Sequence, residues 1–358
     1  MSIHTPRRTE TPIPGFYSPA HAAQWTYAPD QQALFTRAQE YRREHGISAA
    51  ADDTTRVHLL LVDEQKDFCF PEGSLYVGGR SGRGAVEDSD RLARFIYRNL
   101  GVLTQVTCTM DTHFPFQIFF ASFWVDGAGE PLQPYREVTV QQIRSGEARP
   151  NPAVSPWVSA DGYEWLCRQV EFYCSELERV GKYRLYLWPP HCLLGSDGHA
   201  LAGVIHEARL FHAYVRQAPN TVEIKGGNPL TENYSVLAPE VLRRFDGEPL
   251  AERNQSFVGR LVESDLVVVA GQAASHCVKS SVEDLLNEIR SVAPSLARRI
   301  VLLEDCMSAV AVPDPERPGE FIADYTADAA AALERFAAAG VRIGRSTDSV
   351  LDWLEDDD

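Results

Sequence analysis

The chain has little of what would point to a nucleic acid or a membrane as its partner. Its 358 residues carry 34 Lys and Arg against 50 Asp and Glu, which gives a formal net charge of −16, and no long basic run interrupts the acidic background. Such a charge balance disfavours binding to phosphate backbones and to anionic lipids. No apolar stretch approaches the roughly 20 residues that a membrane-spanning helix needs, and no apolar segment follows the basic pair near the amino terminus. We therefore expect a cytoplasmic protein without nucleic-acid or membrane partners.

Cysteine is also scarce, and its pattern excludes one class of protein. The chain has seven cysteines, an odd number at irregular spacing. Small disulfide-stapled domains are shorter and have more regularly spaced cysteines, so we expect reduced thiols here. Six of them are interpreted as packing residues, of which Cys69 and Cys192 lie close enough to the proposed site to line it: Cys69, Cys108, Cys167, Cys174, Cys192 and Cys306.

The seventh cysteine, Cys277, has a different position. It follows the strand-like run 265–270 and a short connection, and the helix-like run 278–289 comes directly after it. A thiol at the carboxyl end of a strand and the amino end of a helix faces unpaired backbone N–H groups, which favour a thiolate. A free buried cysteine more often packs as a small apolar residue, so Cys277 alone does not establish a reactive site.

Two further strand-like runs end in residues that could serve a cysteine nucleophile. Asp63 follows the run 57–62, and Lys225 follows the run 221–224. In an open parallel α/β sheet the reactive groups gather at the carboxyl ends of the strands, so Asp63, Lys225 and Cys277 could share one crevice. The carboxylate could accept the thiol proton, the ammonium group could stabilise the charges, and the sulfur could attack a carbonyl or amidine carbon.

A third group of residues has the composition of a metal site. Asp111 and His113 lie two residues apart at the end of the strand-like run 103–110, so that their side chains point the same way on an extended backbone. His191 follows the strand-like run 183–187 and could converge on them. One carboxylate and two imidazoles suit Zn²⁺, Fe²⁺ or Mn²⁺.

The order of strand-like and helix-like segments predicts the fold class. The two kinds of segment alternate along the chain, which is typical of parallel strands joined by helical crossovers. Strands are expected at 57–62, 103–109, 183–187, 221–224, 265–270, 299–303 and 341–344, and helices at 88–100, 162–180, 198–217, 278–290 and 326–339.

Five short motifs in order resemble the isochorismatase-like cysteine hydrolases, and among them the nicotinamidases. The resemblance covers most of the stretch from about residue 57 to residue 344 and implies a three-layer αβα fold with a mainly parallel, Rossmann-like central sheet. The matching motifs are Val62-Asp63-Glu64-Gln65-Lys66-Asp67-Phe68 with Gly73-Ser74-Leu75, Asp111-Thr112-His113, Trp188-Pro189-Pro190-His191-Cys192, Lys225-Gly226 and the segment from Gly271 to Val278.

The resemblance also implies a reaction, namely deamidation of a small amide through a thioester. In the nicotinamidases one divalent ion with its waters holds the pyridine nitrogen, which implies such an ion here, with Zn²⁺ preferred and Fe²⁺ or Mn²⁺ as alternatives. The family has a cis peptide before the alanine of its cysteine motif, which corresponds to Gln272-Ala273. The implied roles are the catalytic triad Asp63, Lys225 and Cys277, the metal ligands Asp111, His113 and His191, the oxyanion-hole N–H groups of Ala273 and Cys277, and the substrate contacts Phe68, Trp188 and Gln272.

The chain departs from the family near the cysteine and near the metal motif. Between the alanine and the cysteine the family usually has Thr-Asp and then an aromatic residue or His, whereas this chain has Ala274, Ser275 and His276. Many members carry a second His four residues after the metal-binding His, where this chain has Gln117. These differences put the substrate in doubt more than the reaction.

The chain is also longer than most family members. We expect an amino-terminal extension at 1–55, a hydrolase domain at 56–345 with an insertion at about 125–181, and an acidic tail at 346–358. The insertion begins as a loop and closes with an amphipathic helix at 162–180. Because it joins two metal-ligand segments, we expect it to act as a lid over the pocket or as a subunit contact in a homo-oligomer.

Three functions remain open from the sequence. The first is deamidation of nicotinamide or a close heteroaromatic amide. The second keeps the triad but uses a ureido, carbamoyl or other small amide substrate, and loss of the metal would favour it. The third is a catalytically silent relative that binds a partner through its extension and insertion.

Overall fold

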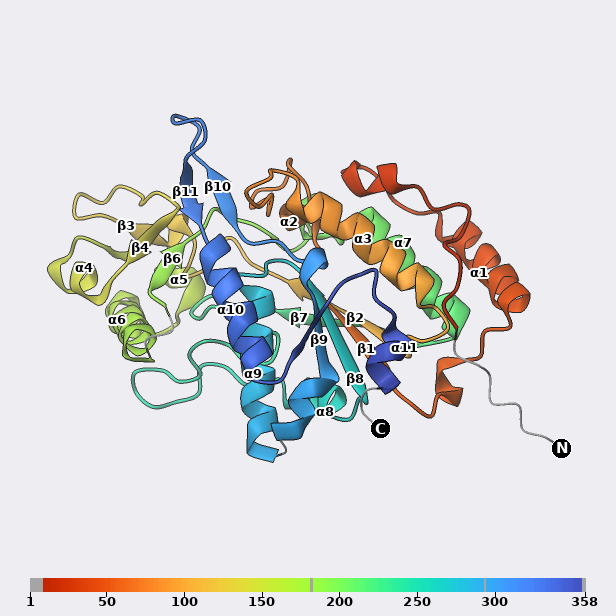
Figure 1. Ribbon diagram of the computed structural model, residues 1–358. Helices are drawn as coiled ribbons and strands as arrows, with labels where there is room; N and C mark the ends of the chain where they lie inside the picture. Colours follow the sequence, from red (N-terminus) through yellow and green to blue (C-terminus); the bar gives the residue numbers. More distant parts are fainter. Residues whose placement is uncertain (1–8, 181–182, 293, 356–358) are drawn as a thin grey trace.

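The computed structural model describes residues 9–180, 183–292 and 294–355, and its centre is a six-stranded sheet in which every neighbouring pair is parallel (Figure 1). The expected α/β class is confirmed. From one edge to the other the strands are β12 (Arg342–Gly344), β9 (Ile300–Leu303), β8 (Leu266–Gly271), β1 (Val57–Val62), β2 (Gln105–Asp111) and β7 (Asn220–Lys225).

The direction in which the sheet grows reverses next to β1. The chain builds β1, β2 and β7 toward one edge, and then returns to place β8, β9 and β12 on the other side of β1. In parallel sheets, such a reversal leaves a crevice at the carboxyl ends of the two central strands, and ligands bind there. The crossover helices are α3 (Gly84–Arg98), α7 (Gly203–Arg216), α8 (Gln255–Val262), α9 (Cys277–Val292) and α10 (Thr326–Ala338).

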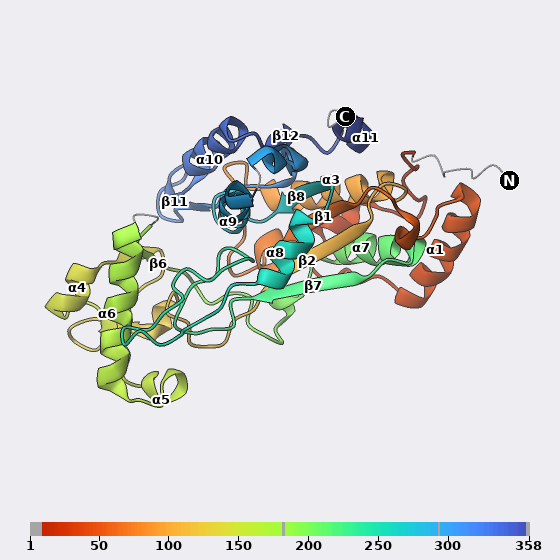
Figure 2. The same cartoon turned by 90° about the horizontal axis from the view of Figure 1, so that it is seen from below.

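Helices cover both faces of the sheet, which gives the three expected layers (Figures 1 and 2). Strand β1 is buried along its whole length and is almost entirely aliphatic, as a strand covered on both faces must be. Leu59 and Leu61 pack in one core with residues of α3 and α7, whereas Leu60 and Val62 pack in a second core with residues of α8, α9 and α10. Alternate side chains of one strand thus anchor both helical layers.

The amino-terminal segment packs against the same layer as α3 and α7. Its helix α1 (Gln31–His45) is capped by Asp30, whose side chain accepts hydrogen bonds from two backbone N–H groups, and is followed by Gly46 in the left-handed conformation. Leu34, Ala38 and Tyr41 are buried in the first core. Helix α11 (Val350–Glu355) lies on this core as well, and residues 356–358 of the expected acidic tail lie outside the described residues.

The prediction that 183–187 forms a strand of the central sheet is wrong. The part of 183–187 that forms a strand is β6 (Leu185–Leu187), and it pairs antiparallel with β4 (Arg136–Val138) outside the central sheet. Leu185 and Leu187 are buried, but in a third core that residues of the expected insertion share with residues such as Phe68 and Ala273. The residue pattern of 183–187 therefore predicts a strand correctly, but it does not predict the strand with which it pairs.

The insertion is more ordered than a loop followed by a helix. Trp124, Leu166, Val170 and Tyr173 fill the third core, which also contains Trp188. The insertion therefore packs against the segment that carries His191. Its elements are β3 (Trp124–Val125), β4, α4 (Val140–Ser145), β5 (Arg149–Pro150), α5 (Ser155–Val158) and α6 (Tyr163–Val180), and the hairpin of β10 (Ala311–Pro313) and β11 (Phe321–Asp324) lies at the same end of the molecule (Figure 1).

The remaining elements are short. In the part of the chain that the structure describes, no helix is long and apolar enough to cross a membrane. The short elements are α2 (Lys66–Cys69) and the 3₁₀ helices η1 (Pro19–Ala23), η2 (Ala50–Asp52), η3 (Ala121–Phe123), η4 (Asp197–His199), η5 (Pro294–Arg299) and η6 (Glu304–Cys306).

Candidate active site

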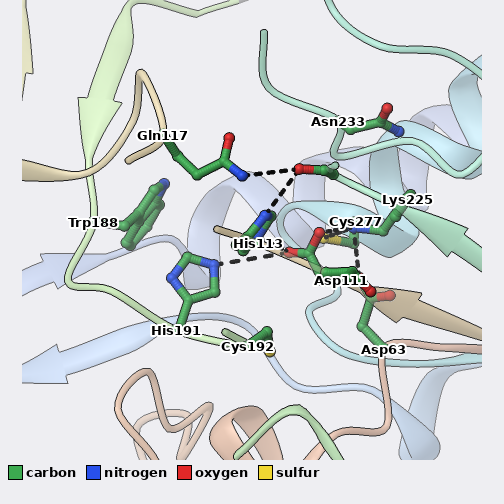
Figure 3. Close-up of polar contacts among 12 residues, drawn as sticks. Asp63, Asp111, His113, Gln117, Trp188, His191, Cys192, Lys225, Asn233 and Cys277 are labelled. Atoms are coloured by element: carbon green, nitrogen blue, oxygen red, sulfur yellow. Dashed lines mark hydrogen bonds and ion pairs between the residues drawn. The ribbon is translucent and has the colours of Figure 1, made fainter. Parts of the chain in front are cut away.

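Four reactive side chains meet at the carboxyl ends of the central strands (Figure 3). Asp63 follows β1 directly, Asp111 ends β2, Lys225 ends β7, and Cys277 is the first residue of α9 after β8. Asp63 has a positive φ of 46°, a conformation that is uncommon for residues other than glycine and that Asp adopts more readily than most. The crevice predicted from the strand ends is therefore present, and it contains all three residues of the expected triad.

Lys225 connects the other three groups. Its Nζ lies 2.9 Å from Asp63 Oδ2, 3.0 Å from Asp111 Oδ1 and 3.6 Å from Cys277 Sγ. The carboxylate oxygens of Asp63 and Asp111 and the sulfur of Cys277 all lie within 4.8 Å of one another. All four residues are buried, so this cation is the nearest compensation for two carboxylates and a developing thiolate.

The surroundings change the acidity of each of these groups. Burial alone would lower the pKa of Lys225, but Asp111, Asp63 and Cys277 hold it well above its usual value, so the amine is charged. Burial raises the pKa of Asp63, although Lys225 opposes the effect, and a carboxylate of raised pKa is a better base.

The cysteine is a thiol at rest. Burial raises the pKa of Cys277 well above its usual value, and Asp63 and Asp111 add to the effect while Lys225 opposes it. Burial and the two carboxylates thus outweigh Lys225 and favour the thiol, whereas the effect of the helix terminus is not among these causes and stays a prediction. The sulfur needs a base, and Asp63 is within reach.

Asp63 is fixed by the neighbouring strand. The hydroxyl of Thr109 donates to Asp63 Oδ1 at 2.5 Å and accepts a hydrogen bond from the Asp63 backbone N–H at 3.0 Å. Because Thr109 belongs to β2, the orientation of the carboxyl group depends on the register of the two strands. The other oxygen, Oδ2, faces Lys225.

Asp111, His113 and His191 form a second cluster whose imidazoles are both oriented toward the carboxylate (Figure 3). Asp111 Oδ2 lies 2.9 Å from His113 Nε2 and 3.8 Å from His191 Nε2. His113 Nδ1 lies 3.2 Å from the carbonyl oxygen of Gly226, and His191 Nδ1 lies 2.8 Å from that of Pro189. A carbonyl oxygen can only accept a hydrogen bond, so each Nδ1 carries a proton. In the neutral form of each ring, Nε2 then presents a lone pair.

Those two lone pairs and the carboxylate form a suitable donor set for a divalent cation. Histidines that bind metals usually donate their other ring N–H to a carbonyl or carboxylate, as both do here. The ligand atoms of the three residues lie within 4.8 Å of one another, and all three residues are buried. The cluster therefore fits the metal that the motifs implied.

Two glycines allow the strand ends to approach this closely. Gly226 has a φ of +86°, and a Cβ at this position would lie 2.6 Å from the His113 ring and 2.7 Å from Asp111 Oδ1. Gly271 has a φ of +116°, and its Cβ would lie 2.1 Å from the carbonyl oxygen of Val62. A side chain at either position would displace a strand end that carries a reactive residue.

A pocket opens beside both clusters, and the space between its lining atoms amounts to about 500 Å³ together with the open solvent at its mouth. Phe68 and Trp188, the two aromatic residues expected to contact the substrate, both line it, and Phe119 from the aromatic segment after Gln117 adds a third ring. Ala273, one of the two expected oxyanion-hole residues, lies in the wall together with Cys277, and the Gln272–Ala273 peptide is cis, as the resemblance implied.

Asp63 and Lys225 are not among the lining residues of the pocket, and neither are four other residues that the sequence placed near the site. The Gln272 amide donates to Asp88 Oδ2 at 3.1 Å and accepts from the Ser308 N–H at 3.3 Å, so its side chain is directed away from a substrate. Cys69 and Cys192 are buried outside the lining. Gln117 donates to the carbonyl oxygen of Gly226 at 3.2 Å and does not belong to the metal-type cluster.

Sequence reasoning missed part of the pocket wall. Glu232, Asn233 and Tyr234 line the pocket from the connection between β7 and α8, and His276 lines it from the residue before Cys277. The Trp188 indole N–H donates to the Tyr234 hydroxyl at 2.8 Å. The connection has no periodic pattern from which its course could have been read. Its attachment to Lys225-Gly226 was the one available signal.

Comparison with known proteins gives a partial sequence match. No family model matches the chain. A nicotinamidase of Escherichia coli strain K12 is 31% identical over 102 residues, which are 28% of this chain and 39% of that protein. The chain thus matches well under half the length of this curated relative.

Solved structures of the same kind of enzyme resemble the whole domain only loosely. The yeast nicotinamidase bound to the inhibitor nicotinaldehyde is 18% identical, with a TM-score of 0.48, over 81% of this chain and 99% of that chain. The Pyrococcus horikoshii pyrazinamidase in complex with zinc is also 18% identical, with a TM-score of 0.40, over 81% of this chain and 99% of that chain. An N-carbamoylsarcosine amidase of Thermoplasma acidophilum is 15% identical, with a TM-score of 0.37, over 83% of this chain and 99% of that chain. The proteins that this chain resembles thus include nicotinamidases, pyrazinamidases and a carbamoyl-compound amidase.

Proposed function

We propose that the chain is an amidohydrolase that converts nicotinamide, or a close heteroaromatic amide, to the acid and ammonia through a thioester on Cys277. The observation that carries the proposal is the position of Lys225 Nζ, within 3.6 Å of a thiol and within 3.0 Å of two carboxylates, beside a cluster that suits a metal. The E. coli relative, which shares 31% identity over 102 residues, supports the same chemistry.

The first half of the reaction forms the thioester. Asp63 accepts the proton of the Cys277 thiol, and the charge of Lys225 stabilises the thiolate as it attacks the amide carbon. We assign stabilisation of the resulting oxyanion to the backbone N–H groups of Ala273 and Cys277. The proton then passes from Asp63 to the amide nitrogen, the carbon–nitrogen bond breaks, and ammonia leaves.

The second half returns the enzyme to its resting state. Asp63, again ionised, accepts a proton from water as the water oxygen attacks the thioester carbon. The carbon–sulfur bond breaks, the acid is released, and the sulfur recovers its proton from Asp63. Because Thr109 fixes the carboxyl group and burial raises its pKa, one residue can act as base and acid in turn.

The substrate ring is held by other residues. Phe68 and Trp188 offer aromatic faces for a flat ring. Asp111, His113 and His191 would hold a divalent cation, Zn²⁺ first and Fe²⁺ or Mn²⁺ as alternatives, through the carboxylate and the two Nε2 lone pairs. Bound there, the cation would supply a directed bond to the ring nitrogen, which positions the amide over Cys277.

The division of the chain remains part of the proposal. We infer a hydrolase domain at 56–345, with an insertion at about 125–181, between an extension at 1–55 and a tail at 346–358. The third core, which contains Phe68 and Trp188 as well as α6, supports a role for the insertion in supporting the pocket wall. Assembly into a homo-oligomer is proposed on the sequence alone.

Ammonia release from a panel of amides tests the function. We expect nicotinamide to be hydrolysed far faster than benzamide, because benzamide keeps the aromatic stacking and lacks the ring nitrogen. Equal rates would exclude positioning by the metal cluster. Faster release from a ureido or carbamoyl compound than from any ring amide would replace the proposed substrate class with that alternative.

A further inference from the structure

One part of the pocket wall is polar, and the proposed reaction does not use it. It consists of Glu232 from the connection after β7 and His276 from the start of α9, with Tyr234 next to both. The ring centroids of Tyr234 and His276 lie 5.4 Å apart. We call Glu232 and His276 the donor wall, for the reasons given below.

The protonation of His276 is set by its neighbour Ser275. The Ser275 hydroxyl accepts a hydrogen bond from the Val310 backbone N–H at 3.1 Å, so its own hydrogen is free to be donated. His276 Nδ1 lies 2.8 Å from this hydroxyl. Ser275 is fully buried and its hydroxyl hydrogen has no other acceptor among the described residues, so we infer that it donates to Nδ1. With Nδ1 as an acceptor, the proton of the neutral imidazole lies on Nε2.

The surroundings of His276 keep the ring neutral and fix its plane. Burial lowers the pKa of His276 to about 3, and Lys279 adds to this effect. The ring makes edge contacts with Trp188 at 5.3 Å and with Tyr325 at 4.7 Å between centroids. The Nε2–H is thus a fixed, uncharged donor on a residue that lines the pocket.

Glu232 is held in a similar way by the insertion. The Tyr173 hydroxyl of α6 accepts a hydrogen bond from the Glu232 backbone N–H and donates to Glu232 Oε2, both at 3.0 Å. Both side chains are buried, with 0% and 2% of their surfaces exposed. Oε1 is buried and makes no hydrogen bond of ordinary geometry among the described residues, and the hydroxyls of Tyr234 and Tyr183 lie close enough to the carboxyl group to lower its pKa.

The carboxyl group is neutral near pH 7. Burial raises the pKa of Glu232 to about 8, and the charge of Glu240 contributes in the same direction. Because Oε2 already accepts from Tyr173, the proton of the neutral acid lies on Oε1. An unsatisfied buried polar atom is costly, so Oε1–H is expected to meet an acceptor when a ligand is bound.

We propose that Glu232 Oε1–H and His276 Nε2–H form a second recognition subsite, which selects ring amides that carry a further hydrogen-bond acceptor on the ring. The inference rests on the proposed amidase function and specifies its substrate class. The amide is held at Cys277 and the ring nitrogen at the metal cluster, so this acceptor is a third point of attachment. Tyr173 acts as a positioning residue, because it orients Glu232 without lining the pocket.

Matched pairs of substituted nicotinamides test the subsite. A methoxy and an ethyl substituent at the same ring carbon differ by one acceptor oxygen and are similar in size. With the wild-type, metal-loaded enzyme we expect kcat/KM for the methoxy compound to exceed that for the ethyl compound about tenfold at ring position 5 or 6, which corresponds to one hydrogen bond. A ratio near one at both positions would overturn the inference.

Variants assign the preference to residues. His276→Phe and Glu232→Leu should each reduce the methoxy-to-ethyl ratio toward one. Ser275→Ala should also reduce the ratio, because without the hydroxyl the proton of the imidazole can move from Nε2 to Nδ1. Tyr173→Phe should reduce it about threefold. Tyr163→Phe is the matched control on α6, because its hydroxyl donates to the carbonyl oxygen of Pro150 and it does not line the pocket, so the ratio should not change.

The outcomes separate this inference from the proposed function. The inference is wrong if the enzyme hydrolyses nicotinamide and the methoxy-to-ethyl ratio is large but unchanged in the variants of His276, Glu232, Ser275 and Tyr173. Another part of the pocket would then bind the acceptor. If the enzyme neither hydrolyses nor binds any ring amide, the proposed function fails and this inference fails with it. Calorimetric titration of the wild-type enzyme with nicotinamide and with the methoxy compounds distinguishes binding without turnover.

Discussion

The pocket has two buried polar regions that differ in charge. At the strand ends, two carboxylates surround the charged Lys225, so Asp63 and Asp111 have a compensating cation at about hydrogen-bond distance. In the donor wall the described residues show no ion pair to Glu232, and its carboxyl group accepts a hydrogen bond from the Tyr173 hydroxyl. Burial therefore leads to charged chemistry in the first region and to neutral hydrogen-bond donors in the second.

The two regions also suit two different tasks, catalysis and recognition. Covalent catalysis requires charges that move between a thiol, a carboxylate and a substrate, and the strand ends hold these groups rigidly. Recognition of a neutral ring requires directed hydrogen bonds without a charge that would have to be desolvated. Variants at the strand ends should therefore lose turnover, whereas variants in the donor wall should lose substrate preference.

The largest effect is expected from removing the nucleophile. Cys277→Ala should abolish ammonia release while the protein remains folded, because the thiolate forms the covalent bond to the substrate. Ammonia release and the far-ultraviolet circular dichroism spectrum are the two measurements. Cys174→Ala is a suitable control, because Cys174 is buried in the core of the insertion and does not line the pocket. Residual turnover of more than a few per cent in Cys277→Ala would exclude the thioester route.

Removing the cation should damage both catalysis and stability. Lys225→Met leaves Asp63 and Asp111 buried without their partner, and breaking a buried ion pair typically costs about 3–5 kcal/mol. We expect activity to fall at least about a thousandfold and the urea midpoint to decrease. Arg144→Met is the control, since its pair with Glu171 is solvent-exposed and should change stability by less than about 1 kcal/mol. Full stability in Lys225→Met would show that the strand-end carboxylates do not depend on this charge.

The metal cluster should affect substrate choice more than chemistry. His191→Ala removes one of the two Nε2 lone pairs, so we expect loss of bound metal and a nicotinamide-to-benzamide ratio that falls toward one. Metal analysis of protein purified without chelator gives the first result, and ammonia release gives the second. His199→Ala is a nearby control, because His199 pairs with Thr112 and lies outside the cluster. Retained metal and an unchanged substrate ratio in His191→Ala would argue that the cluster is structural.

The smallest effect concerns the pH dependence of stability. Glu232 has its pKa raised from 4.5 to about 8 by burial, so between these pH values the folded state holds a proton that the unfolded state has lost. Its contribution to stability is complete below about pH 4.5 and decreases as the pH rises toward 8, by up to about 3 kcal/mol at pH 7. Glu232→Gln should remove this part of the decrease, which urea unfolding at pH 5.5 and 7.5 measures. An identical pH dependence in the variant would show that Glu232 is ionised in the folded protein.

The sequence predicted the strand-end region well because it depends on local pattern and topology. Strands β1, β7 and β8 follow from their aliphatic or alternating runs, and parallel strands present their last residues at one edge of a sheet. Asp63, Lys225 and Cys277 could therefore be brought together without knowledge of any contact between them. The convergence of Asp111 and His113 followed from the two-residue spacing on an extended strand.

The donor wall could not be predicted in this way. Glu232 is set by the path of a connection between β7 and α8 that has no periodic pattern, and by Tyr173 on a helix 59 residues earlier in the chain. His276 has a residue type that the usual motif allows, but its tautomer depends on Ser275, which departs from the motif and accepts a hydrogen bond from Val310 across 35 residues. The strand 183–187 was assigned to the wrong sheet for a related reason, since its partner β4 lies in the insertion.

Trapping the covalent intermediate tests the central claim most directly. The wild-type enzyme is mixed with nicotinamide, quenched in acid during turnover and digested, and its cysteine peptides are analysed by mass spectrometry. We expect a nicotinoyl thioester on Cys277 and on no other cysteine. An acyl group on Cys69 or Cys192, or sustained ammonia release without any acylated cysteine, would contradict it.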